Sequence, residues 1–226
     1  MTKKMLRVGR LIRLAVLASL IAPVVPGWAQ AVPVEKPRAT STPYAGNLAI
    51  FESPGRDQRL QIERVMDLLK LTPGKSVADI GAGSGWFTVR AARRVGAAGT
   101  VYAEDINPQA IQYIEKRAKT EKLANVKTVQ GTPDNTKLPP ASVDAVMLMK
   151  VYHEIAHPIP LMEQLRASLK PGGLVGIIDR NGNGVDHGLD RSVVIREMGE
   201  AGYKVAGKYD FTKADGQDYF LIFTAH

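Results

Sequence analysis

The sequence contains no cysteine. This absence excludes disulfide bonds, thiolate metal sites and anchoring through an acylated cysteine, so the stability of the fold has to come from packing. Hydrophobic residues make up 45% of the chain and charged residues 23%, a composition typical of a globular protein with a buried core. The sequence also lacks an internal repeat and a low-complexity tract. Its 226 residues therefore predict a leader and one domain of ordinary size.

An excess of acidic residues is missing as well, and the formal net charge is +8. The basic excess is unevenly placed, because residues 1–31 contain five basic residues and no acid. The remaining chain holds 25 basic and 22 acidic residues, a balance of +3. Once the leader is set aside, the charge does not support a global nucleic-acid-binding surface.

Residues 1–31 are similar to a secretory signal peptide. A basic segment that ends at Arg13 precedes an apolar run over residues 14–22, which is too short for a comfortable membrane span. Ala29 and Ala31 have the spacing of a cleavage site. We therefore expect a periplasmic or secreted protein, with an uncleaved anchor or a cytoplasmic chain as the alternatives. The leader has no Arg-Arg pair to indicate the twin-arginine route.

The next two segments differ in character. Residues 32–55 are rich in proline and predict a flexible linker. Residues 56–70 carry apolar residues at the spacing of one helix face: Ile62, Val65, Met66 and Leu69. These boundaries predict one folded domain over residues 56–226.

Short apolar segments then alternate with amphipathic ones. The expected strands are residues 77–80, 100–105, 126–130, 143–149 and 174–178, followed by an antiparallel hairpin formed by residues 203–211 and 219–225. The expected helices are residues 87–94, a helix capped by Asn107 with Pro108 at its first position, a helix that begins at Pro158 and Pro160 and carries Leu161, Leu165 and Leu169 on one face, and residues 190–201. This alternation predicts an α/β fold with a parallel sheet and helices on both faces.

A glycine-rich turn separates the first strand from the first of these helices. Asp79 comes two residues before three alternating glycines: Gly81, Gly83 and Gly85. Because glycine has no β-carbon and adopts positive φ at little cost, the backbone can approach a ligand closely here. Nucleotide-like ligands bind at the carboxyl ends of strands in doubly wound sheets. The structural alternative is a tight turn with glycines for packing.

A second acid, Asp105, ends the next strand twenty residues after Gly85. That spacing is typical of a carboxylate that binds a ribose, and it fits both an NAD-binding unit and a nucleoside-binding methyltransferase. Dinucleotide-binding proteins favour G-x-G-x-x-G, in which a helix N-terminus meets the pyrophosphate. The pattern here is D-x-G-x-G-x-G. A carboxylate beside the turn repels a pyrophosphate but suits a ligand with cationic groups.

In this region the sequence resembles the class I S-adenosylmethionine-dependent methyltransferases, of the type 11/25-like kind. The similarity rests on four pieces in the family's order and spacing: VADIGAGSG at 77–85, AEDINP at 103–108, LP at 138–139 with VDAV at 143–146, and LKPGG at 169–173. It covers residue 56 to the C-terminus. The resemblance implies a Rossmann-like, doubly wound α/β/α fold with seven strands in the order 3-2-1-4-5-7-6, strand 7 being antiparallel. It also implies S-adenosyl-L-methionine as the cofactor.

The resemblance assigns the cofactor site to the ends of the strands. Asp79 and the three glycines would surround the methionine moiety and the sugar. Asp105 would hold the ribose hydroxyls, and Ile106 would lie against the adenine.

Three further acceptor groups flank that site. After the third strand the family has an acid that contacts the adenine amino group. Thr132 occupies its position in this chain and Asp134 follows two residues later, so either one is a candidate for that contact. Glu104 precedes the family's ribose-binding acid and is expected to be a solvated surface residue.

The resemblance places the end of the fourth strand beside the methyl group and the acceptor. His153 is a candidate general base, because an imidazole can take a proton from a hydroxyl or an amine; a hydrogen-bonding role that shapes the pocket is the alternative. Tyr152 is a tentative substrate contact, although packing is the simpler role. After the fifth strand, Asp179 and His187 belong to a polar loop over residues 179–188 that is expected to contact the acceptor.

Two more assignments concern the edge of the pocket. Arg56 is a candidate to close it from the other side, and a surface charge at the helix start is the alternative role. Asp186 and His187 offer two kinds of metal ligand. One flexible loop is a poor basis for a metal site, and none is predicted.

The residues and the resemblance together predict an S-adenosylmethionine-dependent methyltransferase with a small-molecule acceptor and no nucleic-acid partner. Two other classes stay open: a nucleoside-binding protein of the same fold without transfer activity, and an NAD-dependent oxidoreductase. A nucleic-acid methylase is disfavoured because no Asn-Pro-Pro-Tyr type of loop follows the fourth strand. The expected export conflicts with the expected cofactor, because S-adenosylmethionine is made in the cytosol and nothing in the sequence explains its supply outside.

Overall fold

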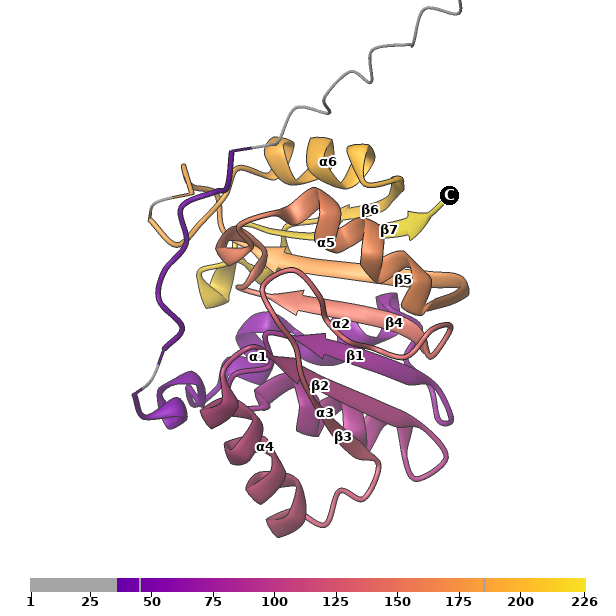
Figure 1. Cartoon of the computed structure of the whole chain (residues 1–226). Helices are drawn as coiled ribbons and strands as arrows, with labels where there is room; N and C mark the ends of the chain where they lie inside the picture. The colour runs from indigo at the N-terminus through magenta and orange to yellow at the C-terminus, as the bar shows by residue number, and fades with distance from the viewer. Residues whose placement is uncertain (1–35, 45, 185) are drawn as a thin grey trace, which may run out of the picture. The chain divides into compact units, whose positions relative to one another are not determined.

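The computed structural model describes residues 36–44, 46–184 and 186–226, so the expected signal peptide lies outside the described residues. Strands and helices alternate along this part of the chain (Figure 1). The strands are β1 (Ser76–Ile80), β2 (Thr100–Asp105), β3 (Val126–Gln130), β4 (Val143–Met149), β5 (Leu169–Asp179), β6 (Tyr203–Tyr209) and β7 (Tyr219–Ala225). The α-helices are α1 (Arg56–Leu60), α2 (Ile62–Leu68), α3 (Trp86–Val95), α4 (Pro108–Thr120), α5 (Pro158–Leu165) and α6 (Arg191–Glu200). Four 3-10 turns complete the described elements: η1 (Leu48–Phe51), η2 (Tyr152–Glu154), η3 (Arg166–Ser168) and η4 (Phe211–Asp215).

The seven strands form one sheet in the order β3-β2-β1-β4-β5-β7-β6. Strands β1 to β5 pair in parallel, and β7 runs antiparallel to both β5 and β6. The predicted doubly wound, Rossmann-like sheet is therefore confirmed. The strand order reverses at β1 and β4, and the carboxyl ends of strands at such a reversal are where ligands bind in this architecture.

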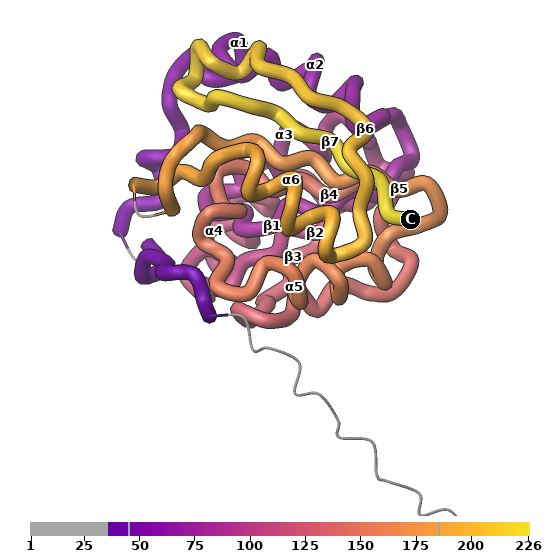
Figure 2. The backbone as a smooth tube through the Cα atoms, turned by 90° about the horizontal axis from the view of Figure 1, so that it is seen from above, coloured from indigo at the N-terminus to yellow at the C-terminus, as the bar shows by residue number. Residues whose placement is uncertain are grey.

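Apolar side chains cover both faces of the sheet. Met66 of α2 and Phe87 of α3 pack on the face that carries Val77 of β1. Met198 of α6 packs on the other face, which carries Ala78 of β1 and is also covered by α5. Figure 2 shows α1 and α2 on one side of the strands and α5 on the other. Neighbouring residues of one strand thus enter opposite layers, as the near-continuous apolar strands require. Among the described residues, no helix has the length and apolar character needed to cross a membrane.

The single helix predicted for residues 56–70 is instead two helices. Gln61 adopts φ +50°, ends α1 and begins α2. The break lets α1 reach η4, where Arg59 Nε lies 3.0 Å from Asp215 Oδ1. The Gln61 side chain donates to the carbonyl of Phe211 in the same turn. Helix α2 buries its apolar face on the sheet, and α1 contacts η4. The apolar spacing in the sequence therefore continues across Gln61, although the helix is broken there.

Two other boundaries also differ from the prediction. β5 begins at Leu169, because this residue pairs with Val143 across a shift in register. Leu169 therefore belongs to the sheet and not to the face of α5. β6 ends at Tyr209, and the connection to β7 contains the 3-10 turn η4 in place of an open loop.

The segment before α1, residues 36–54 without residue 45, belongs to the part of the chain where a flexible linker is expected. We call it the strap. Arg38 donates to both carboxylate oxygens of Glu197 at 2.6 Å, and Glu52 forms an ion pair with Arg117 on α4. The prolines leave most of the strap without regular structure, and charged side chains attach it to the folded domain.

Candidate functional site

The glycine-rich turn lies at the carboxyl end of β1, next to the end of β4. Gly81, Gly83 and Gly85 all have positive φ, between +57° and +71°. A β-carbon on Gly81 would also overlap the side chain of Val151, which follows β4. Gly85 is the N-cap of α3, so the first amides of that helix point toward the turn. The alternating glycines thus meet a backbone requirement, and they make room for the side chains of Val151 and Ile114.

Two predicted acids border this turn and are buried. Asp79 is 2% exposed and accepts a hydrogen bond from the Thr88 hydroxyl at 2.6 Å. Asp105 is 8% exposed and accepts from the backbone N–H groups of Gly83 and Asn107, both at 2.8 Å. Asp105 therefore links the glycine turn to the start of α4.

The expectation that Glu104 is a solvated surface acid is wrong. Its side chain is buried, and Oε2 accepts from the backbone N–H of Gly81 at 3.4 Å. The parallel pairing of β2 with β3 sets Val129 beside it. Gly131, directly after β3, lies so close that a β-carbon there would overlap the Glu104 carboxylate. Strand β3 and the glycine that follows it thus bury Glu104. The residues next to Glu104 in the sequence do not indicate this burial.

Burial changes the protonation of all three acids. It raises the pKa of Asp79 to about 7, although the hydrogen bonds from Thr88 act in the opposite direction. It raises the pKa of Glu104 to about 8, and the charge of Asp105 adds to that effect. Burial also raises the pKa of Asp105, against the lowering effect of hydrogen bonds from the backbone at Asn107. A bound cation would favour the ionised forms and lower these pKa values. The turn therefore suits a ligand with positive charge and hydroxyl groups.

Apolar groups gather beside the three carboxylates. Ile106 is 39% exposed next to Asp105. The strap brings Tyr44 to the same region, since its carbonyl accepts from the Asn107 side chain at 2.9 Å. The Tyr44 ring packs edge-on against Phe51 with centroids 5.7 Å apart. Phe51 in turn lies within contact distance of the β-carbon position of Gly83. A planar base bound here would cover apolar surface that is now exposed.

The two candidates for an adenine contact are not part of the buried acid group. Thr132 and Asp134 are both exposed in a tight turn after β3. The Thr132 hydroxyl donates to the carbonyl of Asn135 at 3.4 Å inside that turn. The structure therefore gives neither residue a distinct position in the site.

His153 and Asp179 form a buried pair at the ends of β4 and β5. His153 Nδ1 lies 2.8 Å from Asp179 Oδ2 and 3.0 Å from Oδ1. Asp179 is fully buried and also accepts from the backbone N–H of Arg180 at 2.9 Å. The carboxylate assigns the proton of a neutral imidazole to Nδ1, so Nε2 carries the lone pair. Asp179, expected as a substrate contact, therefore positions His153.

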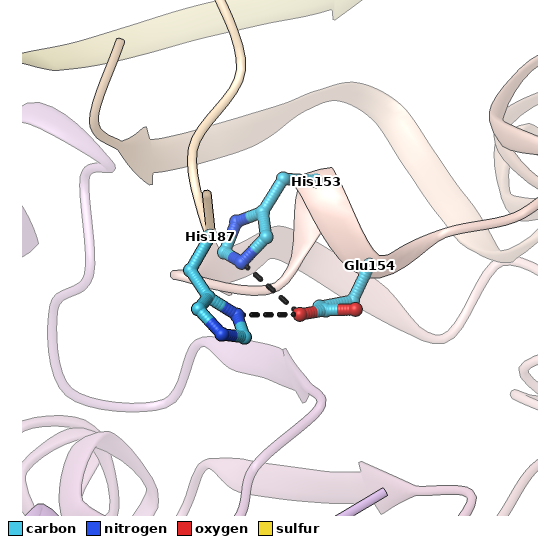
Figure 3. A group of neighbouring side chains, drawn as sticks. All are labelled: His153, Glu154 and His187. Atoms are coloured by element: carbon cyan, nitrogen blue, oxygen red, sulfur yellow. Dashed lines mark hydrogen bonds and ion pairs between the residues drawn. The ribbon is translucent and has the colours of Figure 1, made fainter. Parts of the chain in front are cut away.

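His187 and Glu154 lie beside His153 (Figure 3). His187 Nδ1 is 3.1 Å from Glu154 Oε1, and His153 Nε2 is 3.4 Å from the same oxygen. The strap contributes Ser41, whose N–H and hydroxyl donate to the Glu154 carboxylate at 2.6 and 2.7 Å. Asp186 instead accepts a hydrogen bond within its own loop. Of the two loop residues considered for a metal, only His187 meets other candidate ligands.

Arg56 and Tyr152 are both buried. Arg56 Nε lies 3.3 Å from Asp215 Oδ2, and its guanidinium stacks 4.3 Å from the ring centroid of Trp86. The surface-charge role is therefore wrong for Arg56, which joins α1, α3 and η4. Tyr152 is fully buried in the core layer beneath α5 and α6, so the packing role describes it and the tentative substrate contact does not.

Several residues of the site were not predicted from the sequence. Glu52 and Ser41 belong to the strap, where the proline content indicated a linker and no local pattern marks a contact. Glu154 directly follows His153, and its polar character after an apolar strand was the available signal. Glu104 could have been found only by combining the strand end with the glycine that follows β3.

Known proteins resemble this chain over its central part. Residues 77–173 match the protein family described as Methyltransferase domain. The matched residues begin in β1, contain the glycine turn and all three buried acids, and end inside β5.

Curated proteins that are similar to this chain have different names. A demethylmenaquinone methyltransferase of a Geobacillus species is 28% identical over 113 residues, which are 50% of this chain and 48% of the relative. A protein-L-isoaspartate O-methyltransferase of Pyrococcus horikoshii is 30% identical over 109 residues, 48% of this chain and 46% of the relative. The match thus spans about half the length of these relatives.

A solved structure has the same fold as this chain. The crystal structure of a SAM-dependent methyltransferase from Aquifex aeolicus superposes with a TM-score of 0.73, covering 81% of this chain and 98% of that one. At 22% identity this likeness shows the fold alone.

Proposed function

We propose that this protein is an S-adenosylmethionine-dependent methyltransferase that acts on a small-molecule acceptor. The observation that carries the proposal is the set of three buried carboxylates around the glycine-rich turn. S-adenosylmethionine has a sulfonium, an ammonium and a ribose diol, which supply the positive charge and the hydrogen-bond donors that buried carboxylates require. The names of the curated relatives support the same activity.

The residues present fit this cofactor. Asp79 and the glycines would hold the methionine part, and Asp105 would accept hydrogen bonds from the ribose hydroxyls. Glu104 stands behind the turn and adds negative charge. Ile106 and the aromatic rings of the strap would cover the adenine.

When bound, the cofactor supplies an activated methyl group, which leaves the sulfonium by in-line displacement. The domain's task is to align donor and acceptor and to exclude water. His153 is the proposed base: Asp179 holds its Nδ1–H, so Nε2 can take a proton from an acceptor hydroxyl or amine. His187, at the solvent side of His153, is placed to contact that acceptor.

Calorimetric titration with S-adenosylhomocysteine, the demethylated product, tests the site. We expect micromolar-range binding, and we expect Asp105→Ala to lose most of it. Asp210→Ala is the matched control, because it removes an exposed carboxylate and leaves the buried group intact. Thermal unfolding of both variants shows whether the fold is kept. Equal binding by the wild type and a folded Asp105→Ala variant would contradict the assignment.

A nucleoside-binding protein without transfer activity is the second candidate. It is motivated by Thr132, whose hydroxyl is used within its own turn at the position where the family has an acid. Incubation with methyl-labelled cofactor and a cell-envelope extract separates the two, because label in any product excludes the second candidate. The third candidate is an NAD-dependent oxidoreductase. If the protein belonged to that class, a fluorescence titration would show binding of a reduced nicotinamide cofactor.

Export is a further proposal that rests on residues 1–31. We expect the mature chain to be recovered from the periplasm or the medium with an N-terminus at or near Val32. N-terminal sequencing of the fractionated protein checks this. A full-length chain confined to the cytosolic fraction would contradict it.

A further inference from the structure

Three potential metal ligands converge next to the proposed acceptor side. His153 and Glu154 come from η2, and His187 comes from the loop after β5. Their ligand atoms all lie within 4.8 Å of one another. Figure 3 shows both imidazoles directed at the same oxygen of Glu154.

The hydrogen bonds of His153 leave an unresolved contact in this cluster. Asp179 accepts a hydrogen bond from His153 Nδ1–H, so the neutral ring presents the lone pair of Nε2. That lone pair faces a carboxylate oxygen 3.4 Å away. Two acceptors facing each other repel unless a second proton or a cation lies between them. A metal ion would bind all three side chains, whereas a proton on Nε2 would leave His187 to donate its own Nδ1–H to Glu154.

Two of the three separations are close to those of a metal coordination shell. Two atoms bound to one tetrahedral Zn²⁺ at about 2.0–2.2 Å lie about 3.3–3.6 Å apart. The distances from Glu154 Oε1 to His153 Nε2 and to His187 Nδ1 are 3.4 and 3.1 Å. The site therefore needs little rearrangement to receive an ion.

The surroundings orient the ligands as they do in metal sites. A carboxylate on the far nitrogen of a ligating histidine fixes the ring and raises its basicity, and Asp179 occupies that position on His153. Ser41 holds the carboxylate of Glu154 through two hydrogen bonds. The His187 side chain is 68% exposed, so the cluster opens to solvent and leaves room for a further ligand.

We propose that His153 Nε2, Glu154 Oε1 and His187 Nδ1 form a binding site for a divalent transition-metal ion of the zinc type. Two imidazoles and one carboxylate are the ligand set of catalytic zinc sites, which keep one position open for water or substrate. Mg²⁺ and Ca²⁺ prefer oxygen ligands and fit this set poorly. Asp186, weighed with His187 in the sequence analysis, is not a member.

The inference goes beyond the proposed function and changes one part of it. With a metal bound, Nε2 of His153 is a ligand, and an acceptor hydroxyl would be activated by coordination at the open position. The cofactor site at the glycine turn is unaffected. Metal binding is measured without cofactor or acceptor, so its failure and a failure of methyl transfer are separate results.

Titration of the chelator-stripped full chain with Zn²⁺, against a chromophoric competitor, is the test. We expect one equivalent to bind, and we expect Co²⁺ to give the intense visible bands of a tetrahedral site. His187→Ala and Glu154→Gln should each weaken Zn²⁺ binding at least tenfold. Asp179→Asn should weaken it 10- to 100-fold through His153. Mg²⁺ should not compete.

The chain offers a matched control, because His226 is exposed and lies outside the cluster. His226→Ala should bind Zn²⁺ within twofold of the wild type. Equal affinity in folded His187→Ala and wild-type protein would overturn the proposal. So would the absence of stoichiometric binding together with nitrogen NMR signals of a doubly protonated His153, since a proton would then bridge the ring and Glu154.

Discussion

Gly131 lies directly against the carboxylate of Glu104, so close that a β-carbon on Gly131 would overlap Glu104 Oε1. The glycine follows β3, the acid lies near the end of β2, and the two strands pair in parallel. The contact keeps Glu104 buried beside the glycine turn.

Gly131→Ala should therefore displace Glu104 and weaken cofactor binding. Overpacking of a buried site costs about 1–3 kcal/mol, which corresponds to about a 5- to 150-fold loss of affinity for S-adenosylhomocysteine in calorimetry. Gly199→Ala is the control, since a β-carbon there meets nothing within 4 Å and α6 gains helix propensity. Equal affinities for the two variants would show that Glu104 does not support the cofactor site.

Asp79→Asn should stabilise the ligand-free protein at pH 8 while removing cofactor binding. The folded-state pKa of Asp79 is raised to about 7 by burial, so the unfolded chain releases this proton first and stability falls as pH rises from about 4 to 7. Asparagine does not ionise, so the variant does not lose this stability, and its side-chain oxygen still accepts a hydrogen bond from Thr88. The free energy of unfolding should exceed that of the wild type by up to about 4 kcal/mol at pH 8, and the difference should vanish near pH 4. Thermal melts across this range measure it.

Asp144→Asn provides the opposite sign in the same experiment. Burial acts to raise the pKa of Asp144, but hydrogen bonds from Lys170, Ser76 and Lys75 outweigh it and lower the pKa to about 2. Its stabilisation is present above pH 4 and is lost as pH falls toward 2. The variant should be destabilised at neutral pH by about 1 kcal/mol, because solvent screens this partly exposed group. Parallel pH profiles for the two variants would contradict both assignments.

Cofactor binding should strengthen as pH rises from 5.5 to about 7.5. Asp79 and Glu104, with pKa values of about 7 and 8 in the free protein, bind a cation in their ionised forms. Binding at pH 7 should therefore release protons. Calorimetry in buffers of different ionisation enthalpy counts them, and Glu104→Gln should release fewer. Proton uptake at pH 7 would contradict the model of a carboxylate-held sulfonium.

Arg117→Ala should loosen the strap. Arg117 Nη2 lies 3.1 Å from Glu52 Oε2, and Arg117 also donates to the carbonyl of Ser84 beside the glycine turn. We expect faster hydrogen exchange over residues 46–54 and faster dissociation of S-adenosylhomocysteine, by about three- to tenfold for a loss of about 1 kcal/mol. Arg93→Ala, which breaks an exposed ion pair with Glu121, is the control. Unchanged exchange in Arg117→Ala would show that other contacts hold the strap.

Local patterns account for the parts of the fold that were predicted. Three features depend on residues within a few positions of one another. They are the Asn107–Pro108 start of α4, the bounds of β2, β3 and β4, and the positive φ at Gly81. The strand order was predicted through the family resemblance. The break at Gln61 was missed because its cause is η4, which lies about 150 residues away.

The sequence alone determined which segments become strands and helices, and where a glycine-rich turn follows an acid. Periodicity, capping and glycine geometry act over short distances in the chain. Tertiary structure decided what those residues contact. Parallel pairing buried Glu104 under Gly131, and the neighbouring ends of β4 and β5 brought Asp179 and His187 to His153. Burial and charge depend on chain segments that arrive from elsewhere, and for that reason the chemistry of this site emerges only when the sheet is assembled.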